Sequence, residues 1–449
     1  MVAGGRLITQ VRGLDQGDPR EFCIALDAAT GAELWSRPLD IASYDNLVGY
    51  DDAIDGPRSS PSVVGNRVFV LTSQLKLFCL RADNGGILWQ RDFVAEFGSS
   101  VIAWQSAASP LVVGDLVFVN CNAPGRRLLA VRVSDGTTAW QNHEGSMTHA
   151  SPAFGTLHDT PHVIFVTQSG LIGVVPESGE LQWRLNFQPS GTSTAATPVV
   201  SGGFVYASAA YGAGAWAARI SENGGQWSAT QAWRQRGTAF QNHWSTPVAH
   251  EGFLYSVVES GGRSLACLDV ATGINRWITS SVGSGRLGFG SIIKAGGHLL
   301  VLTEPGELVL IEPDPSGYRE LARQQILTRT CWNIPTVAGG RLFARSSSQL
   351  VALDVAPGTG TLPPLSLAAR LGPDDGKVTV VISGQNGVDL DSSLIGRVEL
   401  RSATSPAEPL DLWTLITAPL SAVDGTWEAV LPADGTPQFI RAQEKTVFP

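Results

Sequence analysis

The chain has 449 residues and a net charge of −9, with 43% hydrophobic and 16% charged residues. This acidic balance excludes nucleic acid as a partner, because binding to phosphates requires a basic face. Fifty glycines and 26 prolines indicate many tight turns between short strands, and therefore an all-β fold.

From the N-terminus onward, the sequence repeats a unit that ends in the pattern Gly-x-x-x-Trp. Copies of this pattern are Gly31–Trp35, Gly85–Trp89, Gly136–Trp140, Gly179–Trp183 and Gly273–Trp277. Most copies follow a Ser/Thr-Pro pair, a Gly-centred turn and an apolar segment such as VVGNRVFVLT. The period of roughly 42–54 residues is typical of the four-stranded blades of a β-propeller.

We predict eight such units, each with an inner strand after the Ser/Thr-Pro pair and an outer strand that carries the tryptophan. The units span 2–36, 59–90, 108–141, 150–185, 196–234, 245–278, 291–326 and 333–356. The tryptophan is expected to cover the gap to the next blade. The fifth unit carries an insertion before Trp233, and the seventh has Leu321 in place of tryptophan. The first unit is expected to lack its inner strand and the eighth its outer strand, which predicts an incomplete seam and a missing upstream part.

A Pro/Gly-rich linker at residues 359–364 separates the expected propeller, residues 1–358, from a second domain, residues 365–449. Short alternating segments in this domain predict strands at 365–371, 377–384, 395–402, 411–417, 426–431 and 437–442. This pattern is typical of a small immunoglobulin-like β-sandwich.

The Gly-x-x-x-Trp spacing, with SPxVxGxxVFV and ALDAATG, resembles the quinoprotein-type (PQQ-like) propeller repeat over residues 1–358. That family includes quinoprotein alcohol dehydrogenases and the BamB-type lipoprotein scaffold of the outer-membrane β-barrel assembly machine. The segments FGSSVIAWQSAASPLV, TPVVSGGFVYASAAYGAG and FQNHW look most like secreted, BamB-like proteins of planctomycete and verrucomicrobial type. The resemblance implies a periplasmic or secreted protein. No stretch of about 18 apolar residues that could span a membrane occurs.

The resemblance implies two features for a dehydrogenase: adjacent cysteines against the quinone, and a Glu/Asn/Asp calcium site beside a catalytic aspartate. The cysteines here are widely separated, at Cys23, Cys79, Cys121, Cys267 and Cys331. The calcium ligands find no match at the corresponding positions, and there is no CxxCH haem motif. No cofactor is therefore predicted, with PQQ and Ca²⁺ kept as an alternative that no motif supports.

In a propeller, the residues just before each inner strand surround one mouth of the central channel. Here they are Arg58, Trp104, Gln105, His149, Thr194, Asn242, His243, Trp244, Arg286, Phe289, Trp332 and Asn333. Aromatic walls with a few polar groups suit small polar ligands such as sugars. These residues are the predicted ligand-binding site.

The leading interpretation is a binding or scaffold protein that meets a protein, or a small polar or carbohydrate ligand, at the channel mouth. The alternative is an enzyme that works in the central funnel, either a divergent quinoprotein oxidoreductase or a carbohydrate-active enzyme. Its candidate catalytic residues are His149, His243 and Arg58. No third ligand accompanies the two histidines, so no metal site is predicted. A run of aspartates, at Asp45, Asp51, Asp52 and Asp55, does not have the spacing of a calcium loop and is expected to be a solvated surface loop.

Overall fold

The computed structural model describes residues 1–44, 56–142, 145–189 and 194–355, and much of residues 365–444. The chain divides into two compact units, Met1–Ala338 with Leu342–Leu353, and Gly339–Arg341 with Asp354–Pro449. In the described residues, no helix is long and apolar enough to cross a membrane.

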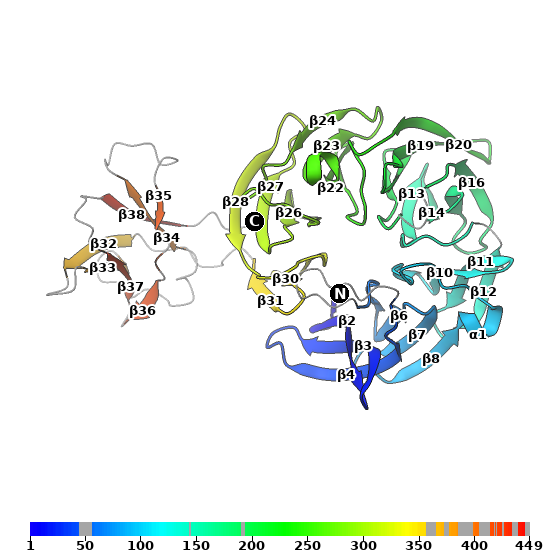
Figure 1. The fold of residues 1–449 in the computed structure, drawn as a ribbon, viewed down its shortest axis with the longest axis horizontal. Helices are drawn as coiled ribbons and strands as arrows, with labels where there is room; N and C mark the ends of the chain where they lie inside the picture. Colours follow the sequence, from blue (N-terminus) through cyan, green and yellow to red (C-terminus); the bar gives the residue numbers. More distant parts are fainter. Residues whose placement is uncertain are drawn as a thin grey trace. The chain divides into compact units, whose positions relative to one another are not determined.

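The N-terminal unit is an array of small antiparallel sheets placed in a ring, as Figure 1 shows. Its first four sheets are β1 (Val2–Ala3), β2 (Arg6–Asp15), β3 (Asp18–Asp27) and β4 (Glu33–Ile41); β5 (Ser62–Val64), β6 (Arg67–Leu71), β7 (Lys76–Arg81) and β8 (Ile87–Asp92); β9 (Leu111–Val113), β10 (Leu116–Ala123), β11 (Arg126–Arg132) and β12 (Thr138–Asn142); and β13 (Ala153–Leu157), β14 (Thr160–Thr167), β15 (Gly170–Val174) and β16 (Leu181–Asn186). A one-turn helix, α1 (Phe93–Phe97), follows β8.

The remaining sheets of the ring continue the same order. They are β17 (Val199–Ser201), β18 (Phe204–Ala209), β19 (Gly214–Asn223) and β20 (Gln226–Gln235); β21 (Val248–His250), β22 (Phe253–Val258), β23 (Ser264–Asp269) and β24 (Asn275–Thr279); β25 (Ser291–Ala295), β26 (His298–Leu302), β27 (Glu307–Glu312) and β28 (Arg319–Gln325); and β29 (Thr336–Ala338), β30 (Arg341–Arg345) and β31 (Leu350–Asp354). A 3-10 turn at Ser260–Gly262 joins β22 to β23. The insertion predicted in the fifth unit lengthens the β19–β20 hairpin, whose strands have ten residues each.

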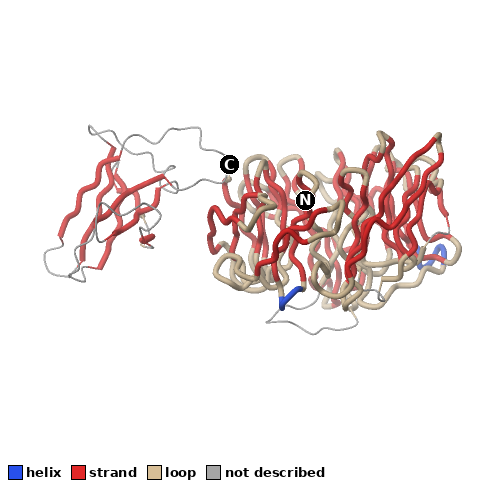
Figure 2. The backbone as a smooth tube through the Cα atoms, turned by 90° about the horizontal axis from the view of Figure 1, so that it is seen from above, coloured by secondary structure: helices blue, strands red, loops and turns tan. Residues whose placement is uncertain are grey.

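Each sheet is an up-and-down meander, and in the second to seventh sheets most residues of the second and third strands are buried, as in β6 and β7. The buried clusters join neighbouring sheets: one combines Phe69, Leu77 and Cys79 of the second sheet with Val117 and Leu129 of the third. The core therefore lies between the sheets, which is the arrangement of a β-propeller. Seen from the side in Figure 2, loops collect at the two ends of the ring.

The first sheet corrects one expectation about the seam. Val2 and Ala3 pair with Leu7 and Arg6, so the first unit does have an inner strand. Its signal was in the sequence, because VAGGRL at residues 2–7 repeats VAGGRL at residues 337–342, the inner hairpin of the last sheet. Among the described residues the last sheet has three strands and no outer one.

The tryptophan of the repeat joins consecutive sheets, as predicted. Trp140 donates its indole N–H to the carbonyl of Pro176 at 2.7 Å, and its ring covers Gly179 in the next sheet. The same bond connects Trp35 to Ala82, Trp89 to Val133, Trp233 to Val270 and Trp277 to Asp314. The Gly of each repeat turn has a positive φ, and in four sheets the tryptophan of the preceding sheet lies directly on it. The Gly-x-x-x-Trp motif therefore marks the contact between one sheet and the next.

The Ser/Thr-Pro pair makes a second inter-sheet contact near the inner strands. The backbone N–H of Ser60 donates to the hydroxyl of Ser109 at 2.8 Å, and that of Ser109 to Ser151 at 2.9 Å. Thr197 and Thr246 repeat the contact at 3.0 Å. The hydroxyls of Ser109, Ser151 and Thr246 thus each accept a bond from the preceding repeat.

The C-terminal unit has two antiparallel sheets. One consists of β32 (Leu365–Leu371), β33 (Lys377–Gly384), β37 (Thr426–Pro432) and β36 (Ser421–Val423); the other of β35 (Thr414–Ile416), β34 (Val398–Ala403) and β38 (Phe439–Glu444). Each of the six expected strands overlaps an observed one, and β36 is additional. Ile382 and Trp427 of the first sheet pack against Val398 and Leu400 of the second, so the unit is a small sandwich.

Candidate functional site

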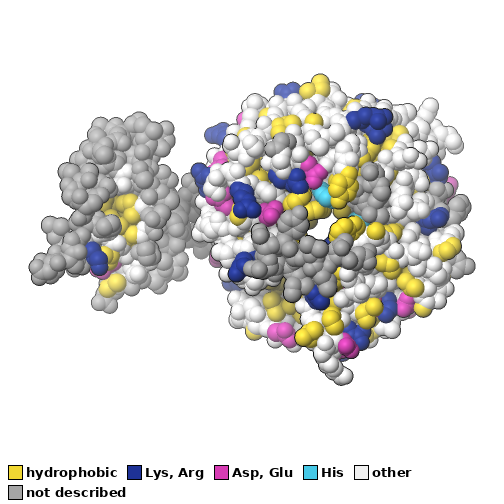
Figure 3. All heavy atoms as spheres, in the orientation of Figure 1, with side chains coloured by type: hydrophobic (Ala, Val, Ile, Leu, Met, Phe, Trp, Pro, Cys, Tyr) yellow, Lys and Arg dark blue, Asp and Glu magenta, His cyan; other side chains and the backbone are white. Residues whose placement is uncertain are grey.

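Two kinds of connection meet at the same end of the ring. In a meander of four strands, the segment before the first strand and the turn between the second and third lie at one end, and the other two turns lie at the opposite end. In Figure 3, hydrophobic, histidine and charged side chains border the hollow at the centre of the ring.

His243 is the centre of a charged group at this mouth. Its Nδ1 lies 3.2 Å from Oε1 of Glu259, which is in the turn between β22 and β23. Arg263 lies 3.4 Å from the same oxygen, and the Gln241 amide donates to Oε2 of Glu259. Burial acts to raise the pKa of Glu259, but the hydrogen bond and charge of His243, with Arg263 and Gln241, lower it below its usual range. The carboxylate is thus held ionised and orients the imidazole.

An aromatic group lies against this charged group. Trp244 and Phe289 stack with ring centroids 4.3 Å apart, and Trp332 meets Trp244 edge-on at 5.8 Å. The guanidinium of Arg263 lies 3.5 Å from the centroid of Phe289. The carboxylate of Glu304 accepts the backbone N–H of Phe289 at 2.7 Å and so fixes that loop. The predicted aromatic residues of the sixth, seventh and eighth repeats are therefore brought together.

Arg58 and Trp104 form a second group, from the second and third repeats. The Arg58 guanidinium donates to the backbone carbonyl of Trp104 and lies 5.6 Å from the ring of Tyr44. The side chain of Trp104 is 47% exposed, and its φ of +68° lies in the left-handed region, which non-glycine residues rarely adopt. A strained, exposed tryptophan held by a charged neighbour is a typical binding feature.

His149 is a buried imidazole in the segment before β13. Burial lowers its pKa to about 4, and the positive charges of Arg58 and His243 lower it further, against a bond to the backbone of Ala103 that raises it. At neutral pH the imidazole is uncharged, and a base with so low a pKa gives little driving force for proton abstraction.

The other predicted residues have different surroundings. Asn242 is fully buried and bonds to Tyr206, Ser256 and Val257, so it is a structural amide that no ligand can reach. Asn333 accepts a bond from Arg345 at 2.9 Å. Gln105 and Thr194 are buried. Arg286 is exposed, and no hydrogen bond or ring contact joins it to the mouth groups within the described residues.

The sequence interpretation missed Glu259 and Arg263, because it considered only segments that precede inner strands. Both residues flank Gly261-Gly262 in the turn between the second and third strands of their sheet. That turn lies at the same end of the ring as the segment containing His243. The alternating directions of the strands in each repeat could therefore have indicated that Glu259 and Arg263 lie at the mouth. The aspartates Asp45, Asp51, Asp52 and Asp55 lie outside the described residues.

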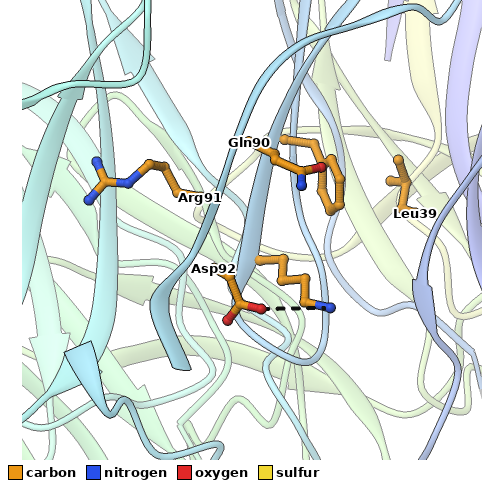
Figure 4. A pocket seen from close by; sticks show the side chains of 6 residues that line it. Leu39, Gln90, Arg91 and Asp92 are labelled. Atoms are coloured by element: carbon orange, nitrogen blue, oxygen red, sulfur yellow. Dashed lines mark ion pairs between the residues drawn. The ribbon is translucent and has the colours of Figure 1, made fainter. Parts of the chain in front are cut away.

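One hollow lies among the mouth residues, and a second is lined by other side chains. A small one of about 10 Å³ lies between His243, Trp244, Glu259, Arg263 and Phe289, and is the size of one water molecule. A larger one of about 150 Å³, drawn in Figure 4, lies between β4 and the β7–β8 hairpin.

Leu39 and Phe78 form the apolar part of the larger hollow, and Gln90 and Asp92 border it. The dashed line in Figure 4 is the 3.8 Å pair between Lys76 and Asp92, and Arg91 points away from them. Lys76 also lies 2.9 Å from the buried Asp40. One lysine thus faces two carboxylates, and each charged side chain that borders the hollow already has a partner.

The described residues do not fit a quinone held with calcium. None of the five cysteines forms a disulfide, and all are buried. No group of three His, Cys, Asp or Glu side chains that could hold a metal ion occurs in the described part of the chain. Glu259 has both carboxylate oxygens engaged by neighbouring donors, and Glu304 accepts the backbone N–H of Phe289.

The sequence profile of the family described as outer membrane protein assembly factor BamB matches residues 21–279, which is more than half of the chain. The chain belongs to this family. A curated BamB, the outer membrane protein assembly factor of Moranella endobia (strain PCIT), is 26% identical over 268 residues, covering 58% of this chain. The chain matches 62% of that relative's length.

Solved structures share the fold. BamB from Moraxella catarrhalis has a TM-score of 0.53 at 16% identity, covering 78% of this chain and 91% of that one. The quinohemoprotein alcohol dehydrogenase of Comamonas testosteroni has a TM-score of 0.51 at 12% identity, covering 76% and 72%. A computationally designed protein, Ika8, has a TM-score of 0.52 at 11% identity, covering 77% and 96%. Binding proteins and enzymes thus share this architecture, so function must be argued from the site.

Proposed function

We propose that this chain is a periplasmic or secreted protein-binding scaffold that holds its partner at the mouth of the propeller channel and carries no PQQ. In this proposal, residues 1–358 form an eight-bladed ring, residues 359–364 a linker, and residues 365–449 an immunoglobulin-like domain. Membership of the BamB family supports a binding role and a location outside the cytoplasm. The secreted planctomycete and verrucomicrobial type stays part of the proposal.

The observation that carries the proposal is the joined aromatic and charged group at the mouth. Trp244, Phe289 and Trp332 come from three different repeats and contact one another, beside His243 oriented by Glu259. Tryptophan and arginine dominate the energy of protein interfaces when a rigid scaffold holds them. The stacked rings and the Arg263–Phe289 contact are fixed before a partner arrives, so little conformational entropy is lost on binding.

The test compares variants at the two ends of the ring. The full-length chain is immobilised and exposed to detergent-solubilised outer-membrane proteins of a Gram-negative bacterium, and retained proteins are identified by mass spectrometry. Trp244→Ala and His243→Ala should lose a partner that the wild type retains. Ile274→Ala should keep it, because this 62% exposed residue lies in a turn at the opposite end of the ring. Equal retention by all four proteins would refute the mouth as the binding site.

The alternative, an enzyme of the central funnel, has the shared dehydrogenase fold as its support. A divergent quinoprotein would bind PQQ with Ca²⁺ in stoichiometric amounts, and its quinone absorbance would appear in the reconstituted protein. We expect no such band, because the cysteines are separate and Glu259 is already saturated by neighbouring donors. A carbohydrate-active enzyme would instead require His149 or His243 to act as acid or base, and the pKa of His149, about 4, makes it a poor general base at neutral pH.

A further inference from the structure

The third strand of the last sheet has an open edge among the described residues. In each of the other sheets of the ring a fourth strand pairs with the third, whereas β31 pairs with β30 alone. The edge of a strand presents a row of backbone N–H and C=O groups, to which a further extended segment can add. The eighth sheet therefore has room for one more strand.

The side chains of β31 lack the cover that their sequence requires. The strand reads LVALD, which matches LACLD at residues 265–269 of β23. Leu265 and Leu268 are fully buried there, beneath the outer strand of the sheet. In β31, by contrast, Leu350 is 38% exposed and no residue of the strand is buried. Because apolar surface left in water costs free energy, an added strand would stabilise this edge.

The first sheet carries the other half of the same missing contact. Arg345 of β30 donates to the backbone carbonyl of Gln10 in β2 at 3.2 Å, so the eighth and first sheets are neighbours (Figure 1). In four other sheets the turn glycine lies under the tryptophan of the preceding sheet, and an added Cβ would lie 2.4 to 2.7 Å from that ring. Gly31 has this position in the first sheet, and no described atom lies within 4 Å of its added Cβ. It is a tryptophan-binding glycine over which the described residues place no ring.

Strand pairing defines where the ring must lie on the added strand. Each tryptophan of the repeat pairs with a small residue of the third strand. These pairs are Ala25 with Trp35, Cys79 with Trp89, Ala130 with Trp140, Gly173 with Trp183, Ala217 with Trp233 and Cys267 with Trp277. Ala352 has the same place in LVALD as Cys267 has in LACLD. An antiparallel strand with an aromatic residue opposite Ala352 would therefore direct its ring toward Gly31.

The sequence after β31 does not have the residues of such a strand. Where Trp277 follows Cys267, the eighth repeat has Leu362, and Pro363 and Pro364 come directly after it. Successive residues of a strand direct their N–H groups to opposite sides, so one of two consecutive prolines would remove a donor that faces β31. The next observed strand, β32, pairs with β33 in the C-terminal unit. These residues are suited to a linker, and the missing strand has to come from elsewhere.

We propose that the seam between the eighth and first sheets binds an extended, tryptophan-bearing segment of a second protein. The segment adds to β31 as a fourth strand and packs its indole on Gly31. Backbone pairing selects an extended chain, and the uncovered glycine selects a flat ring. The inference goes beyond the proposed function, because the turn of Gly31 lies between the third and fourth strands, at the end of the ring opposite the mouth.

The test uses the full chain and a peptide with the sequence of residues 273–279, Ac-Gly-Ile-Asn-Arg-Trp-Ile-Thr-NH₂, whose tryptophan carries a 5-fluoro group. The matched control peptide has alanine in place of the tryptophan. In calorimetry we expect the tryptophan peptide to bind at least about 30-fold more tightly, the usual loss when an aromatic anchor is truncated. Its ¹⁹F signal should shift on binding, because the ring enters a packed contact.

Gly31→Ala tests the position of the ring. The added methyl group meets no described atom in the free protein, but it would occupy the space that the indole requires. We expect this variant to bind the tryptophan peptide about 10-fold more weakly. Gly203→Ala in the fifth sheet is the matched control, since Gly203 has a φ of +80° and open space around its added Cβ. Its affinity should stay within about twofold of the wild type.

Equal affinity for the two peptides would overturn the inference, as would undiminished binding by Gly31→Ala or no binding by the wild type. Sedimentation of the wild type examines the other occupant, a second copy of this chain. A dimer that the peptide does not dissociate would assign the edge to that copy and would also overturn the inference. The comparison of the two peptides uses the wild type, so it holds even if Gly31→Ala fails to fold.

Discussion

Gly179 offers a measurement of what the tryptophan motif contributes to stability. It lies at φ +72° in the turn of the fourth sheet, and a Cβ added there would lie 2.4 Å from ring atoms of Trp140. Gly31 occupies the same position of the first sheet at φ +75°, and no described atom lies within 4 Å of its added Cβ. The two glycines thus share a backbone conformation and differ in the tryptophan.

Gly31→Ala should cost only the left-handed conformation, about 1–2 kcal/mol. Gly179→Ala should add overpacking of about 1–3 kcal/mol against a ring in a buried contact. If Trp140 moves away, the 2.7 Å bond to Pro176 is lost instead, at about 1 kcal/mol or more. We therefore expect Gly179→Ala to be less stable than Gly31→Ala by about 1–3 kcal/mol.

Urea denaturation followed by tryptophan fluorescence and circular dichroism measures both variants against the wild type. A fall in the transition midpoint with an unchanged slope would show lost stability without a change in cooperativity. Equal midpoints for the two variants would refute the reasoning, because they would mean that the ring contact at Gly179 contributes nothing beyond the turn.

Three further outcomes are expected. Trp140→Phe should destabilise more than Trp183→Phe, by about 1 kcal/mol in the same denaturation assay, because Trp183 has no hydrogen-bond partner for its indole N–H among the described residues. Burial holds the pKa of His149 at about 4, so the folded state resists protonation and loses up to about 3 kcal/mol as pH falls from 6.5 to 4. Unfolding curves at pH 7.5 and 4.5 should show this loss in the wild type and a smaller one in His149→Phe; equal losses would contradict it. Thr246→Val removes the acceptor of the Thr197 N–H at 3.0 Å and should cost about 1 kcal/mol, measured as a lower urea midpoint, whereas an unchanged midpoint would exclude a stabilising role for the inner hydroxyls.

The fold could be predicted because the same contact recurs with the same residues. A glycine is required at one fixed place in the sheet that follows Trp35, Trp89 and Trp140. Because the requirement recurs at a regular spacing, it is visible in the sequence. Strand β1 was missed because it has two residues and no Ser/Thr-Pro pair before it. Its Gly4-Gly5 turn, with φ values of +54° and +75°, matches Gly339-Gly340 at +57° and +75° and was the better signal.

The candidate site could be predicted only in part, because neighbours in space are not neighbours in sequence. Three residues that precede inner strands, His243, Trp244 and Phe289, contact one another in the structure. Asn242 is buried and bonds to Tyr206, whereas His243, the next residue, contacts Glu259 at the mouth. Nothing in the segment FQNHW distinguishes these two positions. Which of two adjacent polar side chains enters the core depends on the partners that the folded sheets supply.

The residues at the mouth of the ring differ in chemistry from one repeat to the next. Outer tryptophans and inner Ser/Thr hydroxyls join the sheets in several repeats, and the residues just before the inner strands differ from one repeat to the next. The aromatic contacts at the mouth join the sixth to eighth repeats, and the contact between Arg58 and Trp104 joins the second and third. A partner that binds at the mouth would therefore meet stacked aromatic rings in one group of repeats and an arginine beside an exposed tryptophan in another, and the two surfaces would favour different parts of the partner.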